Sequence, residues 1–241
     1  MRWAYGVTTV PERAKDLLPR TLRSLAVAGF DQPRLFVDGS QSPLISVSNE
    51  LEQTLRWPRI KTFGNWSLGL WELLVRNPAA DRFAMFQDDF MTGKNLKEYL
   101  TRVPYPKNGY LNLYTFPSNQ SLAPENHGWY EARELDHGIA YYGKKQQTGR
   151  GAVALVFSKE AVVTLLTHLD FVTKPIEAAD AHRKVDGCVV NAMNRAGWRE
   201  YVHNPSLIQH TGTNSSMGNA MHLQATSFRG EDFDFLDLLK C

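Results

Sequence analysis

Short apolar runs alternate with helical patterns through the first half of the chain. Leu18, Leu22 and Leu25 recur at the spacing of one helical face, and Pro11 suits the first turn of that helix. A second helix is expected near residues 66–75. Strands are expected at residues 3–10, 34–37, 59–63 and 82–87. This alternation predicts an α/β fold, with a mostly parallel central sheet flanked by helices.

The pattern loosens in the second half. Residues 117–149 are rich in Asn, Gly, Gln and aromatic residues, which predicts loops and short antiparallel pieces. Regular structure is expected again in strands at 109–116 and 152–157, in a helix that begins at Ser158, and in a helix at 185–196. We therefore expect one domain made of two halves, residues 1–105 and a loop-rich part at 106–241.

Composition narrows the protein class only modestly. The 241 residues are 43% hydrophobic and 22% charged, as in ordinary globular proteins, and the net charge of +2 does not demand a nucleic-acid partner. Two cysteines do not form a disulfide framework, which favours a reducing compartment. No apolar run is long enough for a membrane span, and no leader pattern opens the chain, so we expect a cytoplasmic protein of a bacterium or a phage.

Two adjacent carboxylates give the strongest chemical signal. Asp88 and Asp89 follow the apolar run 83–86 and Gln87, which read as a strand buried on both faces. Open α/β sheets bind ligands at the carboxyl ends of their strands, and carboxylate oxygens are preferred ligands of magnesium and manganese. A cation held there would neutralise a diphosphate. The alternative interpretation is a strand that ends in a polar turn.

Gln87-Asp88-Asp89 resembles the Asp-x-Asp or Glu-Asp-Asp motif of glycosyltransferases with the Rossmann-like GT-A fold. The resemblance implies that residues 1–105 bind a nucleotide sugar and that residues 106–241 bind the acceptor and carry catalysis. It makes Asp89 the direct metal ligand, and Gln87 departs from the motif because it is not an acid. It also implies donor contacts by Thr9, Pro11 and Arg13 in the first-strand loop, by Asp38 and Asn65 after the next strands, and by Asp88.

Residues 205–212 resemble the C-terminal segment of the N-acetylglucosaminyltransferase IV-like branch of these enzymes. The resemblance places His210 as the late histidine that completes the metal site. On the residues alone, a histidine in a polar loop is equally compatible with a solvated side chain. The polar stretch 211–216 is able to wrap a phosphate with backbone and hydroxyl donors.

Asp186 is the candidate catalytic base. It opens the helix expected at 185–196, off the buried stripe of that helix, where inverting GT-A enzymes commonly carry this acid. Alternatively, Asp186 complements the helix dipole, and Asp180 and Glu177 compete for the role. Gly151 precedes a predicted strand and would let the backbone approach the donor sugar.

The sequence thus predicts a manganese- or magnesium-dependent, inverting glycosyltransferase of the hexosyltransferase type, with a UDP-sugar as donor. We expect a hydroxymethylated pyrimidine in phage DNA as acceptor, or otherwise a bacterial surface glycan. The DNA hypothesis rests on aromatic and basic residues of the second half, which are Trp129, Tyr130, Tyr141, Tyr142, Lys144, Lys145 and Arg150. A metal-dependent phosphodiesterase or nuclease and an inactive sugar-nucleotide-binding module are the alternatives.

Overall fold

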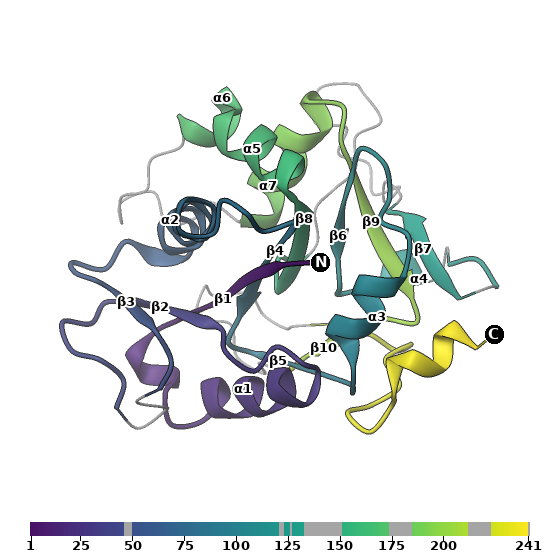
Figure 1. Ribbon diagram of the computed structural model, residues 1–241, viewed down its shortest axis with the longest axis horizontal. Coiled ribbons are helices and arrows are strands. Elements are labelled where there is room, and N and C mark those ends of the chain that lie inside the picture. The colour runs from purple at the N-terminus through teal and green to yellow at the C-terminus, as the bar shows by residue number, and fades with distance from the viewer. Residues whose placement is uncertain are drawn as a thin grey trace.

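A central sheet organises the protein (Figure 1). The computed structural model describes residues 1–45, 50–120, 123–125, 127–132, 151–173, 185–211 and 223–240. Within these residues the sheet has eight strands in the order β3-β2-β1-β4-β8-β6-β9-β7. Their bounds are β1 Trp3–Thr9, β2 Arg34–Asp38, β3 Gln53–Arg56, β4 Arg82–Gln87, β6 Gly109–Asn112, β7 Gly128–Glu131, β8 Ala154–Ser158 and β9 Arg199–Asn204.

The first part of the sheet is parallel. β3, β2, β1 and β4 run in the same direction, and β6 pairs with β9 in parallel. β8 runs antiparallel to both β4 and β6, and β7 runs antiparallel to β9. The predicted α/β fold is confirmed. Strands from both sides of residue 105 belong to this one sheet. The functional division of the chain at residue 105 stays a prediction.

Helices cover both faces of the sheet (Figure 1). α2, α5, α6 and α7 pack on one side, and α1 lies on the other. The helix bounds are η1 Pro11–Arg13, α1 Leu17–Val27, α2 Lys61–Arg76, α3 Leu96–Arg102, α4 Pro117–Gln120, α5 Lys159–Thr167, α6 Leu169–Val172, α7 Val185–Arg195 and η4 Phe235–Leu239. None of the helices in the described ranges is long and apolar enough to cross a membrane.

β4 is buried on both faces, as its apolar run predicts. Because side chains alternate along a strand, Phe83 and Met85 enter the cluster under α2 and α5, whereas Ala84 and Phe86 enter the cluster under α1. All four are fully buried. The strand is therefore fixed between two cores, which holds the residues at its carboxyl end in a defined position.

The prediction of a strand at residues 59–63 is wrong. The third strand is β3, at Gln53–Arg56, and α2 already begins at Lys61. Asp38 explains the early start of the helix, because its two carboxylate oxygens accept the backbone N–H groups of Ile60 and Lys61 at 2.8 and 2.7 Å. This carboxylate satisfies donors that a helix N-terminus leaves unpaired. Likewise, Pro11 belongs to the separate turn η1 rather than to α1.

A second, two-stranded sheet was not predicted. β5 (Phe90–Thr92) pairs antiparallel with β10 (Ile208–His210), and His210 lies opposite Phe90 in the register. β9, which immediately precedes this C-terminal segment, was not predicted either. The small sheet ties residues 208–210 to the segment directly after Asp89.

Gly6 gives a prediction about the stability of the sheet. A Cβ atom at Gly6 would lie 2.5 Å from Cε2 of Phe36 and 2.9 Å from the carbonyl oxygen of Arg34. Both neighbours are held in the sheet, so we expect Gly6→Ala to lower the free energy of unfolding by about 1–3 kcal/mol. Chemical denaturation measures this. Gly187→Ala is the matched control, since its Cβ would meet no atom of the described residues within 4 Å, and equal effects of the two substitutions would contradict the packing argument.

Candidate active site

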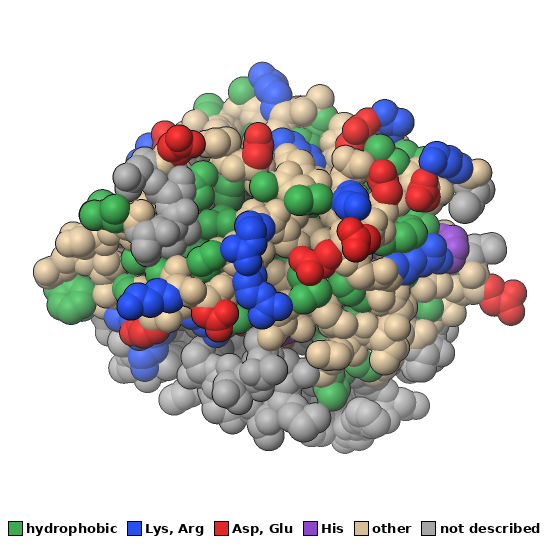
Figure 2. All heavy atoms as spheres, turned by 90° about the horizontal axis from the view of Figure 1, so that it is seen from below, with side chains coloured by type: hydrophobic (Ala, Val, Ile, Leu, Met, Phe, Trp, Pro, Cys, Tyr) green, Lys and Arg blue, Asp and Glu red, His purple; other side chains and the backbone are tan. Residues whose placement is uncertain are grey.

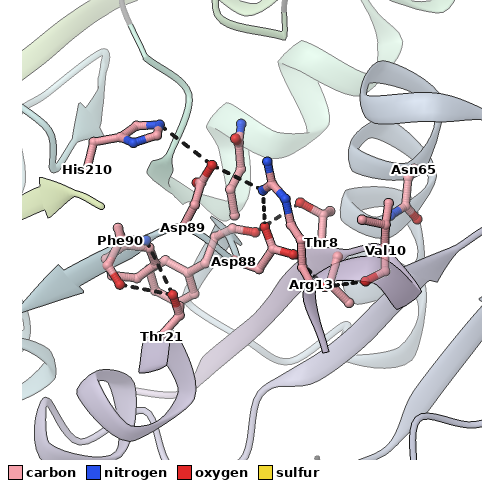
Figure 3. A network of polar contacts seen from close by, with 12 residues as sticks. Thr8, Val10, Arg13, Thr21, Asn65, Asp88, Asp89, Phe90 and His210 are labelled. Carbon is pink, nitrogen blue, oxygen red and sulfur yellow. Dashed lines mark hydrogen bonds and ion pairs between the residues drawn. The ribbon is translucent and has the colours of Figure 1, made fainter. Parts of the chain in front are cut away.

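The two acids lie where the sequence places them, at the carboxyl end of β4 (Figure 3). Asp88 and Asp89 are only 2% and 3% exposed. They connect β4 to β5, so the larger sheet fixes the position of one side of this pair and the smaller sheet fixes the other. Burial of two adjacent carboxylates is costly unless cations or hydrogen-bond donors stabilise them.

His210 reaches the acids through the small sheet. Its Nε2 lies 3.7 Å from Oδ2 of Asp89, and the backbone N–H of Thr211 donates to the Asp89 carbonyl at 2.8 Å. The imidazole is 7% exposed, so it is not the solvated loop histidine that the alternative interpretation describes. The structure thus brings together two side chains that are far apart in the sequence, as the resemblance implies.

Two residues from the end of β1 and the turn after it also contact the acid pair, and Figure 3 shows one of them, Arg13, beside Asp88 and Asp89. Thr9, at the end of β1, donates from its hydroxyl to Oδ2 of Asp88 at 2.5 Å. Arg13, in η1, donates from Nη1 to Oδ1 of Asp88 and lies 3.1 Å from Oδ2 of Asp89. A single guanidinium nitrogen therefore bridges both carboxylates. Pro11 begins η1 and sets the turn that presents Arg13.

Burial dominates the electrostatics of Asp88. It raises the pKa of the carboxyl to about 6, because the Arg13 guanidinium offsets only part of the cost of desolvation, and the charge of Asp89 raises the pKa further. Burial lowers the pKa of Arg13, but the charges of Asp88 and Asp89 outweigh this, so the net shift is upward. The Arg13 guanidinium therefore stays positively charged in the site.

The donor set suits a hard divalent cation that arrives with a phosphate ligand. No group of three or more His, Cys, Asp and Glu side chains among the described residues forms a metal cage. Magnesium characteristically uses one or two carboxylates, with substrate phosphates and waters as the remaining ligands. Asp89 and His210 offer an oxygen and a nitrogen 3.7 Å apart, a spacing compatible with two ligands of one ion. Both acids accept a hydrogen bond from Arg13, and the approach of His210 to Asp89 is what favours Asp89 as the ligand.

Asp38, at the end of β2, and Asn65, in α2, already have structural partners. Asp38 is 2% exposed and fixes the start of α2. The Asn65 side chain accepts from Nε of Arg56 at 2.8 Å and donates to the Phe36 carbonyl at 2.8 Å. Both residues therefore organise the edge formed by β2 and β3. A contact of either residue with a donor nucleotide stays a prediction.

Asp186 and Gly151 contact one another. The backbone N–H of Gly151 donates to Oδ2 of Asp186 at 3.0 Å, and the N–H of Gly187 donates to Oδ1 at 2.9 Å. Gly151 adopts φ of +73°, and a Cβ there would lie 2.8 Å from the Tyr114 ring, so the position requires glycine. Asp186 does open α7 as predicted, and the two N–H groups fix the direction of its carboxylate.

Gln87 links the Asp186 region to the acid pair. Its side-chain amide donates to the Ala152 carbonyl at 2.9 Å, and its backbone N–H donates to the Val153 carbonyl at 2.7 Å. The departure from the acidic motif therefore has a structural role, because a carboxylate at position 87 could not donate this hydrogen bond. The same bond holds residues 151–153 beside the end of β4.

The sequence did not predict the buried acid Glu200, which lies near Asp186. Glu200, on β9, is 3% exposed and accepts from the Tyr110 hydroxyl at 2.8 Å and from the Asn112 amide at 3.4 Å. Burial raises the pKa of Glu200 to about 7; the two hydrogen bonds oppose this in part, and the charge of Asp186 adds to it. Only the tertiary structure shows this cluster, since an exposed position is the ordinary expectation for a glutamate.

We predict a pH-dependent contribution of Glu200 to stability. Its pKa is about 7 in the folded protein against an ordinary value of 4.5, so its stabilising contribution is complete below pH 4.5 and is lost as pH rises through about 7. Glu200→Gln should remove this loss, worth roughly 3 kcal/mol across the window. Denaturation curves between about pH 4 and 8 measure the slope.

The control for this slope is Glu131→Gln, which removes a half-exposed carboxylate from the adjacent strand β7. The free energies of unfolding of wild type and Glu200→Gln should diverge as pH rises from about 4.5 to 7, because only wild type loses stability in that window, and those of the control should stay parallel to wild type. Parallel curves for both variants would contradict the assignment of a raised pKa to Glu200.

Several predicted residues lie outside the described residues. These are the competing bases Asp180 and Glu177, the acceptor-side residues Tyr141, Tyr142, Lys144, Lys145 and Arg150, and most of the polar stretch 211–216. Trp129 and Tyr130 are described and lie on β7. Trp129 packs edge-on against His203 with ring centroids 4.9 Å apart, and the Tyr130 hydroxyl donates to the Asn119 carbonyl at 2.9 Å. Both rings thus have intramolecular partners.

No protein-family model matches this sequence, and no curated protein matches it either. Among solved structures, the fold is similar to GalNAc-T7, solved with UDP, GalNAc and Mn²⁺, with a TM-score of 0.57 and 9% sequence identity. The match covers 90% of this chain but 44% of that chain, so this chain spans less than half the length of GalNAc-T7. The predicted GT-A-like fold is therefore confirmed at the level of architecture.

Two other solved structures align less closely. A nucleoside-diphosphate-sugar pyrophosphorylase from Vibrio cholerae has a TM-score of 0.45 at 10% identity, covering 87% of this chain and 95% of that chain. A mannose-1-phosphate geranyltransferase from Thermus thermophilus has a TM-score of 0.45 at 15% identity, covering 84% of this chain and 74% of that chain. The resemblance to the N-acetylglucosaminyltransferase IV-like branch stays a prediction.

Proposed function

We propose that the protein is a glycosyltransferase that uses a nucleoside diphosphate sugar, with UDP as the nucleotide, and a divalent cation, manganese or magnesium, held by Asp89 and His210. The observation that carries the proposal is the approach of His210 Nε2 to within 3.7 Å of the Asp89 carboxylate at the carboxyl end of β4. The fold supports the proposal, because GalNAc-T7, which has a similar fold, was solved with UDP and Mn²⁺.

The donor would lie across the carboxyl ends of β1, β2 and β4, which is where open α/β sheets bind ligands. A divalent cation bound at Asp89 and His210 would neutralise the charge that develops on the diphosphate leaving group. Arg13 offers a guanidinium fork for phosphate oxygens. We further assign donor contacts to Thr9, Pro11, Asp38, Asn65, Asp88 and Gly151.

Asp186 is proposed as the base of an inverting transfer. An acceptor hydroxyl would lose its proton to Asp186 while its oxygen attacks the anomeric carbon, and the bond to the diphosphate would break on the opposite face. The backbone N–H groups of Gly151 and Gly187 both donate to the Asp186 carboxylate and so fix its orientation.

The transferase proposal is tested by detecting both products. Candidate UDP-sugars are first screened by thermal shift with Mn²⁺, and release of UDP is then measured with and without hydroxyl acceptors, with mass spectrometry of the acceptor. Acceptor-dependent UDP release together with a hexose mass increment supports the proposal. Release of UDP at the same rate with and without an acceptor, or cleavage of a phosphodiester substrate, would support the hydrolase alternative instead.

For the acceptor, we propose a hydroxymethylated pyrimidine in DNA, with a glycan as the alternative outcome of the test. Lys144 and Lys145 are the cations that would follow the DNA backbone. Among the described residues on the face shown in Figure 2, Lys and Arg side chains are interspersed with Asp and Glu. The DNA acceptor therefore rests on Lys144 and Lys145, which lie outside the described residues.

The acceptor proposal predicts salt-dependent binding. The affinity for hydroxymethylated oligonucleotides should fall as salt rises, and Lys144→Ala combined with Lys145→Ala should reduce the salt slope by up to about two. Binding between about 50 and 200 mM salt measures the slope, with unmodified oligonucleotides as control. Absence of oligonucleotide binding, together with transfer to a free oligosaccharide, would replace DNA with a glycan and leave the transferase proposal standing.

A further inference from the structure

The Arg13 guanidinium contacts the carboxylates of both Asp88 and Asp89 (Figure 3). Its Nη1 donates to Oδ1 of Asp88 and lies 3.1 Å from Oδ2 of Asp89, and that same Oδ2 lies 3.7 Å from His210. The Arg13 side chain is 18% exposed, whereas those of Asp88 and Asp89 are 2% and 4% exposed. Arg13 is thus the most exposed of the three side chains, and its guanidinium contacts both buried carboxylates.

Oδ2 of Asp89 would be a partner of two positive charges, the Arg13 guanidinium and a divalent cation. A divalent cation between Asp89 and His210 would share Oδ2 of Asp89 with the guanidinium, at a separation where two positive charges repel strongly in a partly buried site. Arg13 is therefore a competitor of the metal in the protein without ligands. The pair Asp88–Asp89 keeps Arg13 in place because two carboxylates bind one cation.

We propose that Arg13 is the resident counter-ion of the metal-free site and moves from the carboxylates to the diphosphate when the metal and the nucleotide bind together. This inference rests on the proposed function and names how binding at that site is regulated. η1, which carries Arg13, follows directly after β1 at the ligand-binding edge of the sheet. The planar guanidinium is suited to bidentate contact with phosphate, so the nucleotide supplies the partner that Arg13 loses.

The consequence is positive coupling between metal and nucleotide. Metal alone must displace the guanidinium from two carboxylates and brings no anion to replace them, so it binds weakly. Nucleotide alone meets two carboxylates that repel its phosphates. Each ligand removes the obstacle to the other, and thermodynamic linkage requires that the coupling factor be the same in both directions. The arrangement favours the complete metal–nucleotide pair over either component.

The test is Mn²⁺ binding to the metal-free protein without nucleotide, measured by the electron paramagnetic resonance signal of free Mn²⁺. We expect Arg13→Gln to bind Mn²⁺ more tightly than wild type, by a factor in the range of about 5–150 that is typical of coupled sites. UDP should raise the Mn²⁺ affinity of wild type by a similar factor and that of Arg13→Gln by much less. Arg20→Gln removes an exposed charge from α1 and should behave as wild type.

A second variant, Arg13→Lys, keeps the inference testable if Arg13→Gln does not fold. Arg13→Lys keeps the positive charge but loses the planar fork, so Mn²⁺ alone should bind with nearly wild-type affinity while the gain from UDP falls. Equal or weaker Mn²⁺ binding by a folded Arg13→Gln, or unchanged coupling in Arg13→Lys, would overturn the inference. Failure of the proposed function has a different signature, because wild type would then bind no UDP with or without Mn²⁺.

Discussion

Asp89→Asn is expected to lower the affinity for UDP in the presence of Mn²⁺ by at least about 100-fold. Outer-shell partners of metal ligands alone are typically worth about 10–100-fold in metal affinity, and Asp89 is placed as a direct ligand. The substitution keeps the shape of a side chain that is only 3% exposed, so the loss would come from charge and ligand chemistry rather than from a cavity. Isothermal titration calorimetry with Mn²⁺ measures the change.

The matched control is Asp232→Asn, which removes one negative charge from a fully exposed side chain paired with Lys94. It should bind UDP as wild type does. If Asp89→Asn and Asp232→Asn both bind UDP with wild-type affinity, Asp89 is not a metal ligand, and the polar-turn interpretation of the acid pair is the correct one.

Asp186→Asn is expected to slow sugar transfer by about 10²–10⁴-fold while UDP binding stays near wild type. Asparagine retains one acceptor for the N–H groups of Gly151 and Gly187, so the start of α7 should persist. What it loses is the ability to take a proton from the acceptor hydroxyl. Single-turnover transfer rates, measured beside calorimetric UDP affinities, separate these two effects.

Asp170→Asn serves as the control, because Asp170 is an acid of α6 whose partner Arg195 lies at the end of α7. It should leave the transfer rate near wild type. Wild-type transfer by Asp186→Asn would place the base elsewhere, with Asp180 and Glu177 as the next candidates to substitute.

The first half of the fold was predictable because its signals are local. The apolar run before Asp88 fixes β4, and the Leu18, Leu22 and Leu25 spacing fixes α1. The error at residues 59–63 came from a tertiary contact, since Asp38 supplies the cap that starts α2 at Lys61. No pattern within residues 59–63 carries that information.

The site was predictable only in its residue types and chain order. Asp89 and His210 meet because β5 pairs with β10, and strands of three residues are too short to leave a hydrophobic signature. The bridging role of Arg13 and the buried cluster of Glu200 likewise depend on contacts between distant segments. Sequence spacing does not report such contacts.

The most direct test of the metal-dependent transferase account is anomalous diffraction from a crystal of the protein grown with UDP and Mn²⁺. The account predicts one manganese peak about 2.0–2.6 Å from both a carboxylate oxygen of Asp89 and Nε2 of His210, with diphosphate oxygens as further ligands. It also predicts that Arg13 has moved to the diphosphate. UDP bound at the end of β4 without manganese, with Arg13 still on both carboxylates, would contradict it.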